Sequence, residues 1–141
     1  MREIKFRVWD KKENEMFYSN MYQNKTSMIY GLGNFLKECS DIEEPIMQFT
    51  GLKGKNGVDI YEGDIVIVEN YNYHGKNPKK VMFVYYDNLT AQYCTKVEKT
   101  NCKIEDLVME NQPLCFANSI EVIGNIYENP ELLKGEIWAS N

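Results

Sequence analysis

The residue types with the most chemical potential lie in one short stretch, "TGLKGKNGVDIYEGDIV", at positions 50–66. A glycine-rich loop that carries lysine can cradle phosphates, and converging carboxylates can hold a metal or act as acid and base. The stretch supplies both kinds of group, in the glycines Gly51, Gly54 and Gly57, the lysines Lys53 and Lys55, and the acids Asp59, Glu62 and Asp64. Its composition therefore raises two hypotheses, a phosphate site and a carboxylate site.

The spacing argues against the phosphate site. A Walker loop needs a lysine and a hydroxyl residue directly after its last glycine, whereas Gly57 is followed by Val58 and Asp59. The dinucleotide pattern G-x-G-x-x-G also fails, because that pattern must follow a strand and open a helix. The pair Asn56-Gly57 is instead typical of a tight turn that requires positive φ. We therefore expect a turn here and no nucleotide site.

The carboxylates do not have the spacing of a cation loop either, since ligands at alternate positions and a distal glutamate are missing. Asp64 precedes the apolar run "IVIV", so we expect its carboxylate to accept backbone N–H groups in a turn. The single histidine, His74, has no evident nucleophile or orienting partner. We therefore expect no catalytic residue, no metal site and no cofactor.

The cysteines point to a reducing compartment. Cys39, Cys94, Cys102 and Cys115 form no CxxC pair, so neither structural zinc nor a disulfide framework is expected. The opening "MREIKFRVWD" has no apolar core of a signal peptide, and no apolar stretch is long enough to span a membrane. These features predict a cytoplasmic protein.

The charge balance disfavours nucleic acid as a partner. The chain has 141 residues and a formal net charge of −5, whereas a nucleic-acid binder generally presents a positive face. A local exception remains open, because lysines and stacking aromatic rings together can bind single strands. Its candidate residues are Lys76, Lys79, Lys80, Tyr71 and Tyr73, with ordinary surface tyrosines as the competing interpretation.

Hydrophobic periodicity predicts a hairpin and then a helix at the start of the chain. "IKFRV" alternates apolar and basic residues, which is typical of a half-buried strand, and "MFYS" can return beside it. Gly31 and Gly33 weaken the helix, which begins either before or only after them, and Pro45 ends it. Its apolar stripe consists of Met28, Leu32, Phe35, Leu36 and Cys39.

From residue 46 onward the pattern favours short strands. The run "DIVIVEN" predicts one strand, 81–86 and 89–95 predict a hairpin about a two-residue turn at Asp87-Asn88, and 104–108 suggests a short helix. We expect a mainly β protein with minor α structure. Its expected parts are an N-terminal hairpin and helix over residues 1–45, and a small SH3-like β-barrel with a C-terminal tail over 46–141.

Three blocks, "MREIKFRVWD", "QFTGLKGKNGVDIYEGDIV" and "IEVIGNIYENPELL", resemble the YopX family of bacteriophage and prophage proteins. The resemblance implies a C-terminal SH3-like barrel and an N-terminal region that takes part in homo-oligomer assembly, without a known activity or cofactor. Gly54 and Val58 depart from the family pattern, which is often acidic at the first position and usually polar at the second. The family-signature residues, for which a structural role is expected, are Thr50, Gly51, Gly57, Tyr61, Glu62, Gly63, Asp64, Gly124 and Asn125.

These observations together predict a non-enzymatic phage accessory protein in the host cytoplasm. It would act as an oligomeric binding or scaffold module whose host or phage partner is unknown. One alternative is a nucleic-acid-associated module that uses the local Lys/Tyr face. The other is an enzyme whose site forms between subunits.

Overall fold

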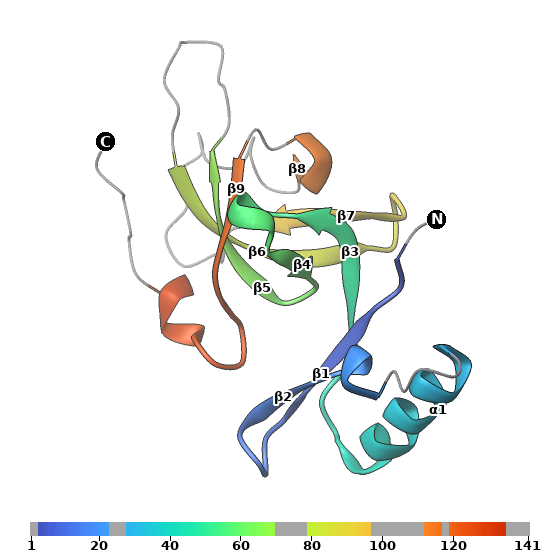
Figure 1. Cartoon of the computed structure of the whole chain (residues 1–141). Helices are drawn as coiled ribbons and strands as arrows, with labels where there is room; N and C mark the ends of the chain where they lie inside the picture. Colours follow the sequence, from blue (N-terminus) through green and yellow to red (C-terminus); the bar gives the residue numbers. More distant parts are fainter. Residues whose placement is uncertain (1–2, 23–27, 70–78, 97–111, 117–118, 135–141) are drawn as a thin grey trace. The chain divides into compact units, whose positions relative to one another are not determined.

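A computed structural model describes residues 3–22, 28–69, 79–96, 112–116 and 119–134 of the chain. The chain divides into two compact units, Met1–Gly51 and Leu52–Asn141 (Figure 1). The domain boundary expected from the sequence lies six residues earlier, after residue 45. The described residues are mainly β with one α-helix, which confirms the predicted fold class at that level.

The first unit is built on the predicted hairpin. Strands β1 (Phe6–Asp10) and β2 (Glu15–Tyr18) pair antiparallel, and the Asp10 carboxylate accepts the backbone N–H of Lys12 at 2.8 Å in the turn between them. Strand β3 (Met47–Lys53) begins in this unit and pairs with β1. It ends in the second unit, and β4 is its other neighbour in the strand order β2-β1-β3-β4.

The helix α1 (Met28–Glu38) contains both glycines, so it begins before them. Phe35 is fully buried and packs in one cluster with Val8 of β1 and Cys39, as the predicted stripe requires. Leu36 was assigned to the same stripe, but its side chain is 49% exposed, so that assignment was wrong. Two 3₁₀ segments flank the helix, η1 (Ser19–Tyr22) and η2 (Cys39–Asp41).

Strand β1 is covered more fully than its sequence pattern predicts. Phe6 and Val8 share the cluster beneath α1, which agrees with the alternation. Arg7 and Trp9 alternate with them and are each only 5% exposed. The expected half-buried strand is therefore buried on both faces, and the methylene stem of Arg7 contributes to packing.

The second unit is a five-stranded antiparallel sheet in the order β8-β7-β6-β5-β9, and it is strongly bent (Figure 1). After β4 (Asp59–Tyr61), its strands are β5 (Asp64–Glu69), β6 (Lys79–Asp87), β7 (Gln92–Lys96), β8 (Gln112–Pro113) and β9 (Ser119–Asn125). Register shifts between Ile65 and Val66, so Ile123 of β9 is an extra residue in a β-bulge. The core cluster comprises Ile60, Val66, Val68, Met82, Val84, Leu114 and Ile120.

The turn between β6 and β7 differs from the prediction. Asp87 pairs with Gln92, so four residues, 88–91, connect the strands rather than two. The Asp87 carboxylate accepts the N–H of Leu89 at 3.0 Å and the hydroxyl of Thr90 at 2.8 Å, and Ala91 has a φ of 53°. The side-chain hydrogen bonds stabilise the longer turn. The predicted short helix at 104–108 lies outside the described residues.

Candidate functional site

The β4–β5 turn, Tyr61–Asp64, holds four of the signature residues. Gly63 has a φ of 78°, a left-handed conformation that favours glycine. Asp64 is 1% exposed, and its Oδ2 accepts the backbone N–H of Tyr61 at 2.8 Å. This is the turn-acceptor role that its position before the apolar run predicts. The carboxylate therefore contributes to the structure of the turn.

A second turn follows β9. Oδ1 of Asn125 accepts the backbone N–H groups of Tyr127 at 3.0 Å and Glu128 at 2.9 Å, and its Nδ2 donates to the Glu128 carboxylate. A Cβ on Gly124 would lie 2.5 Å from Oδ1 of Asn129, so only glycine fits this approach without a shift of that side chain. The 3₁₀ segment η6 (Pro130–Leu133) begins directly after this turn.

These two turns meet although Asp64 and Asn125 lie 61 positions apart in the sequence. Asp64 pairs with Asn125 in the β5–β9 ladder. The carbonyl oxygen of Gly63 accepts a hydrogen bond from the N–H of Ile126 at 2.9 Å. The N–H of Gly63 donates to the carbonyl oxygen of Val84 on β6 at 2.8 Å. Six signature residues thus form one cluster, which we call the signature cluster: Tyr61, Glu62, Gly63, Asp64, Gly124 and Asn125.

The other three signature residues lie elsewhere. Thr50 and Gly51 belong to β3, where Gly51 has a φ of 86°, and Gly57 lies in the β3–β4 connection with a φ of 75°. That connection contains η3 (Lys55–Gly57), which is the expected Asn-Gly turn, and Asn56 also has a positive φ of 64°. Gly57 donates its N–H to the carbonyl oxygen of Gly54 at 3.1 Å. The stretch that suggested a phosphate cradle is a turn.

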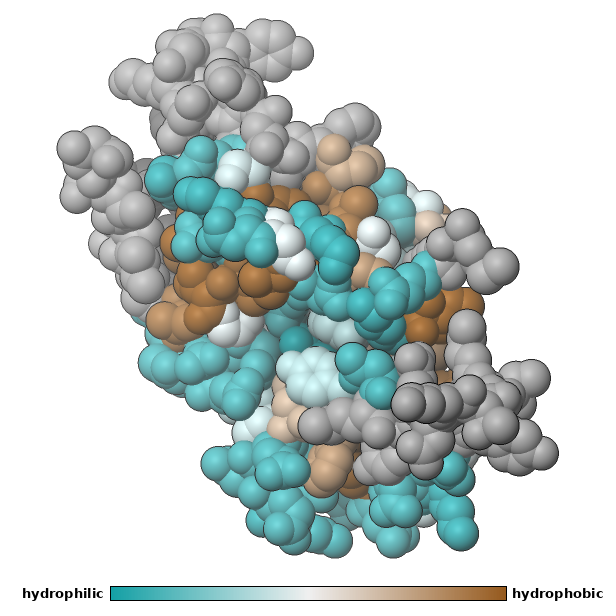
Figure 2. Space-filling view, in the orientation of Figure 1, coloured by the Kyte–Doolittle hydropathy of each residue, from teal (hydrophilic) through white to brown (hydrophobic). Residues whose placement is uncertain are grey.

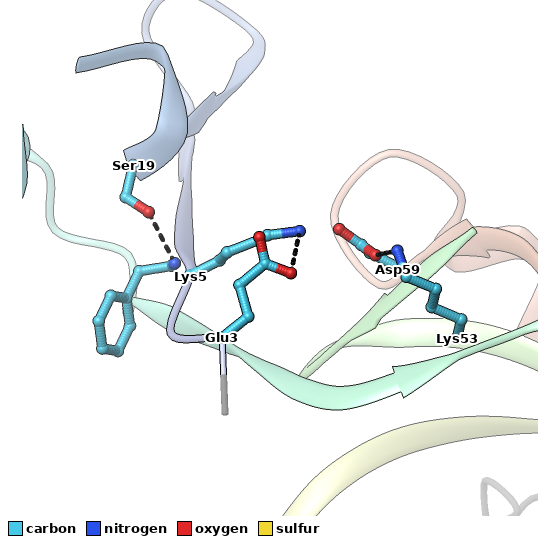
Figure 3. A network of polar contacts seen from close by, with 6 residues as sticks. Glu3, Lys5, Ser19, Lys53 and Asp59 are labelled. Carbon is cyan, nitrogen blue, oxygen red and sulfur yellow. Dashed lines mark hydrogen bonds and ion pairs between the residues drawn. The ribbon is translucent and has the colours of Figure 1, made fainter. Parts of the chain in front are cut away.

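Two of the acids of this stretch, Asp59 and Asp64, interact with different neighbouring groups. Asp59 forms an ion pair with Lys53 across the β3–β4 turn (Figure 3), whereas Asp64 is committed to the backbone of Tyr61. Within the described ranges, no group of three or more His, Cys, Asp or Glu side chains could hold a metal ion. His74 lies outside those ranges.

Of the predicted Lys/Tyr face, Lys79 and Lys80 lie within the described residues, and Tyr71, Tyr73 and Lys76 lie outside them. Lys79 forms an ion pair with Glu69 at 2.8 Å, and Lys80 pairs in register with Val68. The hydrogen bond from Lys79 lowers the pKa of Glu69, and the same contact raises the pKa of Lys79. The positive charge of Lys79 is thus already balanced within the sheet.

Replacing Lys79 by methionine is expected to raise the pKa of Glu69 toward its ordinary value, because the hydrogen bond and the charge are both lost. The pair stabilises the fold at neutral pH, and this contribution is lost as pH falls through the lowered Glu69 pKa. An NMR titration of the Glu69 side-chain carboxyl measures the shift. Lys37→Met, on α1 in the other unit, is the control, and an unchanged Glu69 pKa in Lys79→Met contradicts the pairing.

Strands β6 and β7 carry aromatic contacts that the sequence pattern does not predict. Tyr86 and Tyr93 pack edge-to-face with ring centroids 5.2 Å apart, and the Lys96 ammonium lies 6.0 Å from the Tyr85 ring centroid. Phe83 and Tyr85 lie two positions apart on β6, and their rings are in tilted contact. Cross-strand register, which depends on the length of the β6–β7 turn, was the missing signal.

Two of the three described cysteines are packing residues, and the third is a surface thiol. Cys39 and Cys94 are buried, and burial is the main cause that raises the pKa of each thiol. A raised pKa keeps a thiol protonated and unreactive at neutral pH. Cys115 is exposed, and Cys102 lies outside the described residues.

The fold and the cluster define a small, mainly β protein of two compact units, in which the signature side chains hold turns together. A family model described as YopX protein matches residues 5–134. The chain therefore belongs to the YopX family, as its three sequence blocks indicated.

Among solved structures, the chain is similar to a crystal structure of protein EF1440 from Enterococcus faecalis. The two share 28% sequence identity with a TM-score of 0.54, over 94% of this chain and 99% of that chain. No curated protein matches the chain. No helix in the described part of the chain is long and apolar enough to cross a membrane.

Proposed function

We propose that this protein is a non-enzymatic phage accessory protein that acts in the host cytoplasm as an oligomeric binding or scaffold module. The observation that carries the proposal is that the polar side chains of the signature cluster form hydrogen bonds within the fold. The polar groups of Asp64 and Asn125 are engaged by backbone N–H groups or by a neighbouring side chain. The most chemically suggestive residues of the chain thus serve the architecture of the second unit.

The second unit, with its strongly bent sheet, is proposed to be an SH3-like barrel. Short, curled strands that close around a small core are typical of that architecture. Gly54 supports closure, because its Cα approaches the carbonyl oxygen of Ile120 on β9 so closely that a Cβ would lie 2.9 Å from it. Figure 2 shows hydrophobic surface on this unit, interrupted by polar side chains, and such surface suits a binding face.

The first unit is proposed to mediate assembly of identical subunits. Three of its large apolar side chains are exposed: Ile4 by 51%, Leu36 by 49% and Ile46 by 41%. Their burial against a second copy would remove apolar area from water, which is the main favourable contribution to most protein association. No catalytic role is assigned to any residue in this proposal.

Light scattering coupled to size exclusion at micromolar concentration tests the assembly. We expect an oligomer for the unmodified chain and a smaller species for the double variant Leu36→Glu/Ile46→Glu, because buried unpaired charges oppose association. Glu43→Gln, in the same unit, is the matched control and should leave the mass unchanged. A monomeric unmodified chain would refute assembly without touching the binding role.

Nucleic-acid binding is the weaker candidate. The Glu69–Lys79 pair opposes it, because that lysine already has an anionic partner. Binding of labelled oligonucleotides that strengthens as salt is lowered would favour this alternative, since phosphate contacts release counterions.

A further inference from the structure

The sequence Asn-Gly occurs once in the chain, at positions 56 and 57. Asparagine is among the thermally labile residues of proteins. In an Asn-Gly pair, the glycine main-chain nitrogen can attack Cγ of the asparagine side chain. A carbon–nitrogen bond forms, the side-chain nitrogen leaves as ammonia, and a five-membered succinimide results. Water then opens the ring to aspartate or isoaspartate, so the reaction needs no oxidant or other reagent.

The folded turn holds these atoms in an unreactive arrangement. Asn56 has a ψ of 17°, which places the Gly57 nitrogen close to eclipsing the backbone nitrogen of Asn56 and away from its Cβ. Ring closure requires the Gly57 nitrogen and the side chain on the same side of the Cα–C bond. The Gly57 N–H is also donated to the carbonyl oxygen of Gly54 at 3.1 Å, which opposes the loss of its proton. Attack therefore requires the turn to open.

Three further contacts keep the turn closed. The Gly54 N–H donates to the carbonyl oxygen of Val58 at 2.7 Å, and Lys53 pairs with Asp59 across the connection. The Cα of Gly54 lies against the backbone of Ile120, so the turn is seated on β9. Asn56 and Gly57 are nevertheless exposed, and a Cβ on Gly57 would meet nothing within 4 Å. Water thus reaches the pair whenever the turn opens.

We propose that Asn56 is a site of spontaneous deamidation whose rate is set by local opening of the β3–β4 turn. The product carries a new carboxylate beside Lys53 and Lys55, and the isoaspartate form adds one carbon to the main chain. A lengthened main chain cannot re-form the hydrogen bond from residue 57 to Gly54. Deamidation therefore converts the closed turn into an open one.

The 141-residue chain is incubated at physiological temperature in mildly alkaline buffer, either folded or unfolded in urea, and the mass of the peptide around residue 56 is followed. We expect the folded protein to react roughly tenfold or more slowly than the unfolded chain, because reaction proceeds only from the open state. Equal rates in the two states would overturn the protective role of the turn. An unfolded chain that keeps Asn56 intact would overturn the site itself.

Gly54→Ala tests the gating directly. Its Cβ would press on the backbone of Ile120, so the turn should open more often and the folded rate should rise several-fold toward the unfolded rate. Gly33→Ala, where a Cβ meets nothing within 4 Å, is the control and should react like the unmodified chain. If Gly54→Ala does not fold, as judged by circular dichroism, Asp59→Asn removes the ion pair instead. A folded Gly54→Ala or Asp59→Asn protein with an unchanged rate contradicts the gating.

Discussion

Replacing Phe35 by alanine is expected to lower the free energy of unfolding of the first unit by about 3–5 kcal/mol. The ring of Phe35 is fully buried and packs in one cluster with Val8 of β1 and Cys39. Its removal loses the transfer energy of the ring and leaves a cavity that the surrounding side chains fill only in part. A unit of about fifty residues has little stability to spare, so α1 should separate from the hairpin.

Urea unfolding followed by Trp9 fluorescence measures this loss, because Trp9 is buried in the same unit. The chain has one other tryptophan, Trp138, which is replaced by phenylalanine in every variant so that the signal reports Trp9 alone. Asn34→Ala is the matched control, since Asn34 neighbours Phe35 on α1 and is exposed. Its loss should stay within about 1 kcal/mol, as for other surface substitutions. Equal losses in the two variants would mean that the cluster does not stabilise the unit.

Phe35 and its neighbour Leu36 also show how far the helix could be predicted. A period of 3.6 places both Phe35 and Leu36 near the apolar stripe, and only the width of the covered face decides between them. The sequence left the helix start open because glycine costs about 1 kcal/mol per position in a helix interior. The structure has α1 begin before both glycines, since packing of a buried face outweighs such local preferences.

Local turn chemistry was the most predictable part of the candidate site. The turn preference of Asn56-Gly57 and of Asp64 depends on these residues and their sequence neighbours alone, and both positions form turns as expected. The meeting of Gly63 with Ile126 was not predictable, because periodicity holds no information on contacts between distant segments. The β6–β7 register was missed for a related reason. Asp87-Asn88 matched a two-residue turn, whereas hydrogen bonds from Leu89 and Thr90 to Asp87 stabilise a four-residue turn.

Replacing Asp64 by alanine should have the second largest effect. We expect it to lower the free energy of unfolding of the second unit by about 1–3 kcal/mol. The carboxylate is 1% exposed and accepts the N–H of Tyr61, so its removal leaves a buried donor without this acceptor. Water cannot readily replace the lost acceptor at a buried site, and an unsatisfied polar group there carries its full desolvation cost. Because Asp64 also pairs with Asn125, loosening of the β4–β5 turn should reach the turn after β9.

Two further substitutions distinguish the effect of burial from the effect of the lost hydrogen bond in Asp64→Ala. Asp64→Asn keeps a carbonyl oxygen that can accept the Tyr61 N–H, so its loss should be smaller than that of Asp64→Ala. Asp87→Ala removes a carboxylate that accepts the N–H of Leu89 in an exposed turn, where water can take its place. Urea midpoints at unchanged m-value compare the three variants, and amide exchange at Tyr61 reports the turn directly. If Asp87→Ala destabilised the protein as much as Asp64→Ala, burial of the signature carboxylate would not explain its role.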